Sequence, residues 1–173
     1  MIVALFNIMG IWPVIYACVA LIDGHNQQAR AWPFVAGSFG VGAFLILPYL
    51  IWRSPNPTFK GPKNWVLGIV DSRWLGLLLL LGSLVLMGYG LIAGDWGQFF
   101  EQWRTNRFIH VMSLDFCLLW LLFPALLGDD MARRGLKNQG LFFAIAAVPL
   151  IGAASYLALR PPLPAEAAEP NPV

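Results

Sequence analysis

Asp115 is the residue whose type and position could most readily do chemistry. It stands about seven residues into a long apolar run, which at ~1.5 Å per residue places it about 10 Å below the membrane interface if that run is a spanning helix. An ionisable side chain at that depth is costly, and it commonly marks an ion pathway, a proton relay or a partner contact. The structural alternative is a protonated or hydrogen-bonded Asp115 that joins two helices.

His110 and Ser113 lie three residues apart and therefore share one face of the same predicted helix. A histidine near the end of a span can ligate the magnesium of a chlorophyll or the iron of a haem, so His110 is a candidate cofactor ligand. It could equally be an interfacial histidine that is hydrogen-bonded to a headgroup or a loop. Asp115 is rotated about 140° away from His110 on a helix, which excludes a direct pair between them.

The sequence GDDMARRG, residues 128–135, carries the next candidate group. Asp129 with Arg133, and Asp130 with Arg134, are pairs at i, i+4, a spacing that stabilises a helix. The two arginines could also contact anionic headgroups or the carboxylates of a protein partner. The plainer interpretation of these charges is a solvated helix end.

The composition indicates a membrane protein. Of the 173 residues, 58% are hydrophobic and 12% charged, with a mean hydropathy of +0.67; soluble domains have about 45–50% apolar and about 25% charged residues. The bilayer is the solvent that accepts such an excess. A net charge of +2 is too small to indicate nucleic-acid binding. No Cys-x-x-Cys, Walker or dinucleotide glycine motif is present, which favours a protein that is not an enzyme.

Five apolar runs are each long enough to cross a bilayer as a helix. Continuous rather than alternating apolar patterns favour helices over a barrel. We therefore expect an all-α membrane protein with a bundle of about five transmembrane helices in one domain, residues 1–160. No clear internal repeat is expected. The predicted spans are about 2–22, 33–52, 74–93, 108–127 and 141–159.

Shorter segments surround the spans. Residues 95–105 place Trp96, Phe99, Phe100 and Trp103 on one face, which predicts a short amphipathic helix in the interface. Residues 64–73 are a second candidate for such a helix, or an early start of the third span. Residues 161–173 are rich in Pro, Ala and Glu, and we expect them to form a disordered tail.

Five spans would place the N-terminus on the same side as the loops 53–73 and 128–140. More Lys and Arg residues lie there than on the other side, and the positive-inside rule then puts the N-terminus in the cytoplasm or stroma. The same arrangement gathers polar groups on the opposite side, where they could form a metal or proton-handling site. These groups are Asp23, His25, Glu101, His110 and Asp115.

Three stretches carry a resemblance to known proteins: NIMGIWPVIYACVALIDG, SFGVGAFLILPYL and, above all, RFIHVMSLDFCLLWLLFPALLGDDMARRG. Over about residues 7–164 the chain resembles a family of integral membrane proteins of cyanobacteria and chloroplasts. The resemblance implies a thylakoid or plasma membrane of a photosynthetic cell, and a further apolar segment before residue 1. It brings no biochemical activity, so no catalytic residue is carried over.

Three functions follow from these observations. The first is a non-catalytic auxiliary or assembly component of a photosynthetic membrane complex, with the bilayer and that complex as partners. The second is a small transporter or channel that uses Asp115, favoured also by the prolines inside the spans. The third is a chlorophyll- or haem-binding protein that uses His110.

Overall fold

All regular secondary structure in the described part of the chain is α-helical. The computed structural model describes residues 1–25, 27–59 and 62–164, and within these ranges it contains ten helices and no strand. The expectation of an all-α protein is confirmed. The helices are α1 (Ile2–Asp23), α2 (Trp32–Val41), α3 (Ala43–Trp52), α4 (Trp65–Val70), α5 (Arg73–Ile92), α6 (Trp96–Thr105), α7 (Arg107–Leu122), α8 (Pro124–Arg133), α9 (Gln139–Ala147) and α10 (Ile151–Leu159).

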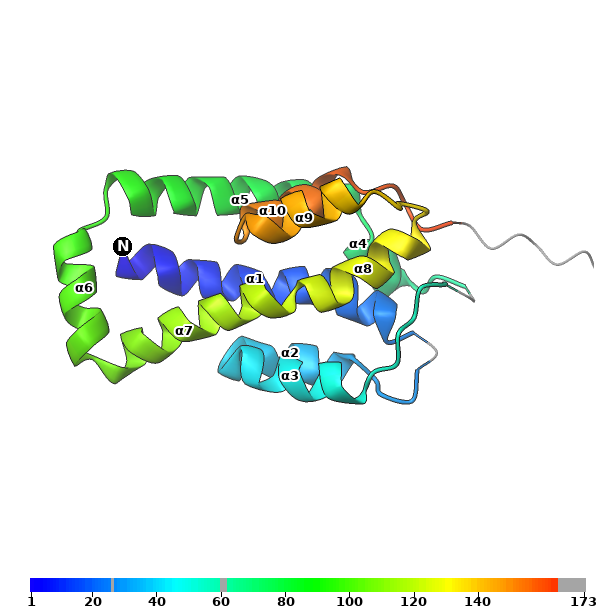
Figure 1. Cartoon of the computed structure of the whole chain (residues 1–173), viewed down its shortest axis with the longest axis horizontal. Coiled ribbons are helices and arrows are strands. Elements are labelled where there is room, and N and C mark those ends of the chain that lie inside the picture. The colour runs from blue at the N-terminus through cyan, green and yellow to red at the C-terminus, as the bar shows by residue number, and fades with distance from the viewer. Residues whose placement is uncertain (26, 60–61, 165–173) are drawn as a thin grey trace, which may run out of the picture.

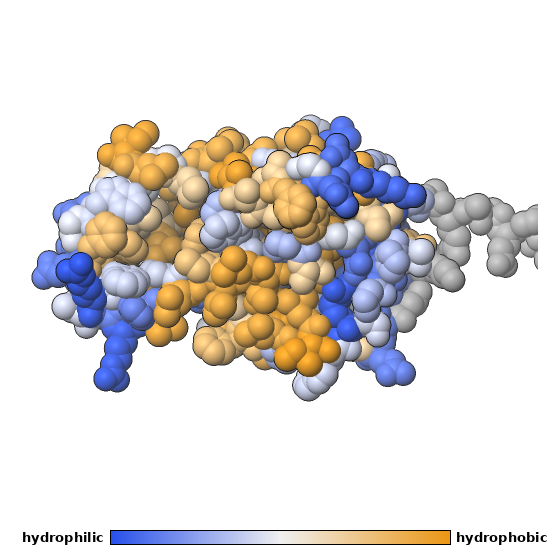
Figure 2. Space-filling model, viewed as in Figure 1, coloured by the Kyte–Doolittle hydropathy of each residue, from blue (hydrophilic) through white to orange (hydrophobic). Residues whose placement is uncertain are grey.

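Three elements of the described chain are long and apolar enough to cross a membrane: α1, α5, and α7 with α8, which together run from Arg107 to Arg133. Pro124 marks the junction of α7 and α8, where its ring and missing N–H interrupt the helical hydrogen bonds. On the face shown in Figure 2, apolar residues cover the middle of the molecule and hydrophilic residues gather at its two ends. This pattern is compatible with an integral membrane protein.

The predicted span 33–52 is not one helix but a hairpin of α2 and α3 (Figure 1). The chain turns at Gly42, whose φ of +57° is readily adopted only by glycine. Aromatic contacts hold the two helices side by side. The ring centre of Phe34, near the start of α2, lies 5.8 Å from that of Tyr49 and 5.7 Å from that of Trp52. The hairpin therefore begins and ends at the same end of the molecule.

The predicted span 141–159 is a second hairpin, formed by α9 and α10. Pro149 disfavours a helical conformation of the residue before it, and Val148 is accordingly extended. Leu150 then adopts a φ of +59°, and a Cβ on Gly152 would overlap the carbonyl of Ile145. The count of about five spanning helices is therefore not confirmed, because two of the five apolar runs turn back on themselves.

The hairpins change which loops share a side. The N-terminus and α6 lie together at one end, which we call the N-terminal end (Figure 1). The loops after α1, α3 and α8 and the end of α10 meet at the other end, which we call the charged end. The prediction that the N-terminus shares a side with the loops 53–73 and 128–140 is therefore wrong.

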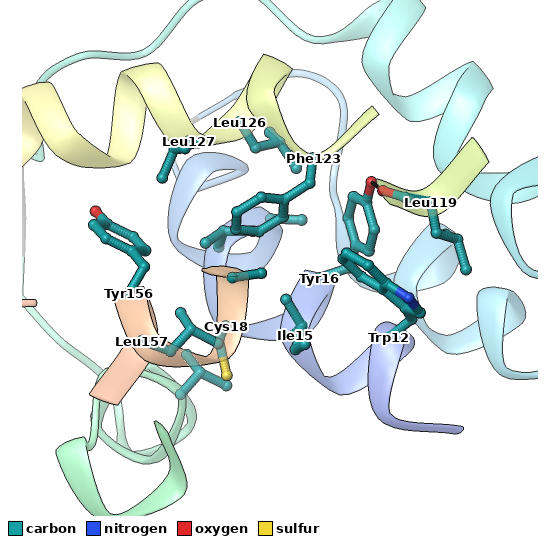
Figure 3. Close-up of a cluster of buried hydrophobic side chains, with 14 of the residues drawn as sticks. Trp12, Ile15, Tyr16, Cys18, Leu119, Phe123, Leu126, Leu127, Tyr156 and Leu157 are labelled. Atoms are coloured by element: carbon teal, nitrogen blue, oxygen red, sulfur yellow. Dashed lines mark hydrogen bonds between the residues drawn. The ribbon is translucent and has the colours of Figure 1, made fainter. Parts of the chain in front are cut away.

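The core lies around α1. In the most apolar 18-residue stretch of α1, 50% of the residues are buried, compared with 22% in the corresponding stretch of α5. Trp12 and Tyr16 of α1 pack against Phe123 at the junction of α7 and α8 (Figure 3). The hydroxyl of Tyr16 donates to the carbonyl oxygen of Leu119 over 2.6 Å. α10 completes the cluster through Tyr156 and Leu157.

The smaller predicted elements are present in part. The amphipathic helix expected at 95–105 is α6, which begins after the capping side chain of Asp95. The segment 64–73 contains the short helix α4. Only residues 161–164 of the expected tail lie within the described residues, and there Leu163 is buried and its N–H donates to Asp71. Residues 165–173 lie outside the described residues.

The contact between α5 and α10 depends on Gly76. A Cβ at this position would overlap the backbone of Leu157 and Ala158, so we expect Gly76→Val to separate the two helices and to destabilise the protein by about 1–3 kcal/mol. The measurement is the melting temperature of the detergent-solubilised protein. Gly88→Val is the matched control, because a Cβ on Gly88 of the same helix meets no atom within 4 Å. Equal melting temperatures for the two variants would contradict this packing.

Candidate functional site

A cluster of ion-paired side chains is buried at the charged end. Asp130 contributes a carboxylate with no exposed surface, and Arg133, Arg134 and Arg160 are each less than a tenth exposed. Buried charges must be paired, because removing them from water is expensive. We call this set the charge cluster. Its members are Asp23, Arg53, Asp71, Asp129, Asp130, Arg133, Arg134 and Arg160.

The first centre of the charge cluster is Asp23, the last residue of α1. Tyr49 of α3 donates to its Oδ2 over 2.6 Å. Arg53, directly after α3, binds both carboxylate oxygens over 2.8 and 3.0 Å. Arg133 adds a third cationic contact of 2.6 Å to Oδ1. A bidentate arginine pair of this kind fixes geometry as well as charge.

The second centre, Asp130 of α8, has the same kinds of partner as the first. Tyr156 of α10 donates to its Oδ2 over 2.7 Å, and Arg160, directly after α10, does so over 2.9 Å. Arg134 binds the same oxygen over 2.9 Å. Each centre thus joins the end of a long helix to the end of the hairpin that follows it.

The two centres have the same spacing in the chain. The tyrosine follows its aspartate by 26 residues in both, and the arginine follows by 30 in both. The sequence Tyr-Leu-x-x-Arg-x-Pro-x-Pro begins at both Tyr49 and Tyr156. The chain therefore contains two copies of one unit, a long helix followed by a hairpin. The expectation of no clear repeat was wrong, and this nine-residue pattern was the signal that could have revealed it.

Arg133 connects the two units. Its guanidinium contacts Asp23 of the first unit over 2.6 Å and Asp130 of the second over 3.4 Å. Its Nε donates to the carbonyl of Asn56 over 2.6 Å. Asp129 pairs with Arg53 rather than with Arg133. Of the two predicted i, i+4 pairs, only Asp130 with Arg134 is formed, and these side chains are buried rather than part of a solvated helix end.

Asp71, in the loop between α4 and α5, extends the charge cluster toward the surface. Burial would raise the pKa of its carboxyl, but hydrogen bonds from Lys63 and Arg134, the positive charge of Arg134 and the N–H of Leu163 together hold that pKa below its usual value. The carboxylate is therefore ionised at neutral pH. It anchors Arg134 over 2.7 Å and Lys63 over 2.8 Å.

Asp115 lies away from the charge cluster, at the tip of the first hairpin. Its Oδ1 accepts a 2.8 Å hydrogen bond from the N–H of Ala43, the first residue of α3. The carboxyl sits against Gly42, where any Cβ would overlap it. The structure thus brings together the acid that the sequence predicts inside the membrane and the turn between α2 and α3. Ser38 donates to Val35 instead and does not bind Asp115.

A cavity of about 540 Å³ adjoins Asp115 between α1, α7 and the tip of the first hairpin. Four phenylalanines stand at its walls, and each is more than half exposed. Ligand pockets are commonly 300–1,000 Å³ in volume and mostly apolar, with few polar groups. The phenylalanines are Phe6, Phe39, Phe44 and Phe108.

His110 and Ser113 do not line this cavity. The Nδ1 of His110 lies 3.0 Å from the carbonyl oxygen of Trp103, which can only accept, so Nδ1 carries the hydrogen and donates. The hydroxyl of Ser113 donates to the carbonyl of Ile109 over 2.7 Å. His110 is thus hydrogen-bonded to the end of α6, and its role as a chlorophyll or haem ligand stays a prediction.

The metal or proton-handling site suggested by Asp23, His25, Glu101, His110 and Asp115 is not assembled. Asp23 lies in the charge cluster, at the opposite end from Glu101 of α6. Within residues 1–25, 27–59 and 62–164, no group of three or more His, Cys, Asp or Glu side chains could hold a metal ion.

Comparison of the chain with protein-family models, with curated proteins and with solved structures found no match.

The charge cluster predicts a large difference between two neighbouring aspartates. Asp130→Asn removes the charge that faces three buried arginines, and breaking a buried pair in this way costs about 3–5 kcal/mol. The side chain of Asp129 is 21% exposed, forms an ion pair with one arginine, Arg53, and accepts a hydrogen bond from the N–H of Asn56, so Asp129→Asn should cost clearly less. Thermal unfolding in detergent measures both, and equal losses would contradict the central position of Asp130.

Proposed function

We propose that the chain is a small membrane carrier that binds its solute in the cavity at Asp115. The observation that supports this proposal is the carboxylate hydrogen-bonded to the break between α2 and α3, beside a cavity of about 540 Å³. Irregular backbone at membrane depth is tolerated only inside protein or along a cavity. Transporters place their substrate and ion sites at such broken helices near the middle of the bilayer.

The two copies of the helix-and-hairpin unit give this proposal further support. Many transporters are built from repeated units, and some of these repeats run in parallel. Here both long helices end at the charged end, and both hairpins begin and end there. The binding groups differ between the units, because Asp115 of the second unit reaches the hairpin tip of the first.

We propose an integral membrane location with the charged end in the cytoplasm or stroma. Arg104 and Arg107 are the only Lys or Arg residues of the described chain at the N-terminal end. The positive-inside rule therefore places the N-terminus outside. Compared with the orientation expected from five spans, the loops 53–73 and 128–140 stay in the cytoplasm or stroma. Only the N-terminus changes side, because it lies at the opposite end of the molecule from these loops.

A thylakoid or plasma membrane, and a place in a photosynthetic complex, remain predictions from the resemblance of the sequence. A carrier protein located in a thylakoid or plasma membrane is consistent with both of these predictions.

Transport at Asp115 is testable with solid-supported membrane electrophysiology on proteoliposomes. We expect at least one solute from a panel of neutral, anionic and cationic small molecules to produce a transient current in the wild type. Asp115→Asn keeps the side-chain volume and an acceptor for Ala43 but loses the charge, and it should reduce that current at least tenfold. A panel without any Asp115-dependent current would contradict the proposal.

A further inference from the structure

Among the described residues, Asp115 is the only ionisable side chain that lines its cavity, and the hydroxyl of Ser38 in the same lining already donates to the carbonyl of Val35. The lining contains no Lys, Arg or His. The second carboxylate oxygen of Asp115, Oδ2, has no hydrogen-bond donor among the described residues, whereas Oδ1 is bonded to Ala43. The free carboxylate oxygen therefore favours a ligand that supplies a positive charge or a hydrogen-bond donor.

The end of α2 contributes partial negative charge at this turn, while the N–H of Ala43, which begins α3, is taken up by Asp115 Oδ1. The carbonyl of Ser38 accepts from the N–H of Gly42, but within the described chain no backbone N–H binds the carbonyls of residues 39–41. All three residues line the cavity. The free carbonyls at a helix C-terminus carry partial negative charge, which favours a cation.

Asp115 also differs from the acids of the charge cluster. Asp23, Asp71, Asp129 and Asp130 each pair with at least one arginine, while Asp115 has no ion-pair partner within the described residues and is only 8% exposed. An acid at membrane depth normally has a counter-charge or faces a pathway. The N–H of Ala43 at the start of α3 serves Oδ1, and a cationic ligand would supply the counter-charge for Oδ2.

The size and walls of the cavity restrict the kind of cation. A volume of about 540 Å³ is that of a pocket for an organic molecule rather than for a bare metal ion. The faces of phenylalanine rings attract organic cations, and four of these residues surround the opening. Because those residues are exposed on the apolar flank of the molecule, an amphipathic ligand can enter from the lipid.

On these grounds, and resting on the carrier function proposed above, we propose that the cavity binds a lipophilic organic cation, an ammonium or phosphonium with an apolar body. Its charge lies beside Asp115 Oδ2 and the carbonyls that end α2. Its apolar body lies among the phenylalanines of α1, α3 and α7.

Binding of radiolabelled tetraphenylphosphonium to the full chain in lipid nanodiscs tests this proposal, with empty nanodiscs as the background. We expect saturable binding that unlabelled tetraphenylphosphonium displaces and that tetraphenylborate, an anion of the same shape, does not. Asp115→Asn should weaken the affinity at least tenfold. Undiminished binding in Asp115→Asn, or equal displacement by tetraphenylborate, would overturn the proposal.

A cavity-filling variant keeps the test decisive if Asp115→Asn does not fold. A Cβ on Gly40 meets no atom within 4 Å, and Gly40 lines the cavity, so Gly40→Leu should occupy the space and reduce binding at least tenfold. Gly88→Leu, equally free of close contacts but outside the cavity, should bind like the wild type. Equal binding by both glycine variants would place the cation elsewhere and refute the site.

The proposal that the ligand is a cation can be wrong even if the protein is a carrier. An Asp115-dependent current driven by a neutral or anionic solute, together with absent tetraphenylphosphonium binding, would leave a carrier whose ligand is not a cation.

Discussion

The burial of the charge cluster is the constraint on which the rest of the structure depends. Asp23 and Asp130 are fully buried, and a buried carboxylate is tolerable only with cationic partners close by. Those partners, Arg53 and Arg160, directly follow the second helix of each hairpin. The start and the end of each hairpin must therefore reach the same end of the molecule, so each of the two apolar runs turns back on itself.

This constraint creates the hairpin tips, and the tips differ in how their backbone groups are satisfied. At the first tip, the carboxylate of Asp115 accepts from Ala43, and a cavity remains beside it. At the second tip, the indole N–H of Trp120 donates to Ala146, and Leu150 is fully buried. The same unit thus forms a polar, hollow tip in one copy and an apolar, closed tip in the other, which is the asymmetry that the carrier proposal uses.

The sequence predicted the helical class, the three long helices and the amphipathic α6, because each of these depends on local composition and spacing. It did not predict the hairpins. Hydropathy along the sequence shows how long an apolar run is, but not whether the chain turns back within that run. Gly42 and Pro149 were visible as helix breakers, but both residues also occur in spanning helices. The arginines that join each hairpin to its aspartate, Arg53 and Arg160, lie 30 residues after Asp23 and Asp130. That distance is beyond any local pattern, and only the repeated Tyr-Leu-x-x-Arg sequence pointed to them.

The sidedness of the loops that flank the first hairpin tests the central claim most directly. Single cysteines at Gln28, Thr58 and Thr105, all exposed, would be introduced with Cys117 replaced by alanine, while Cys18 is buried. A membrane-impermeant maleimide would then be applied from either side of membranes that contain the protein. The account predicts that Gln28→Cys and Thr58→Cys react from one side and Thr105→Cys from the other. Reaction of Gln28→Cys and Thr58→Cys from opposite sides would show that residues 33–52 cross the membrane, and would contradict the account.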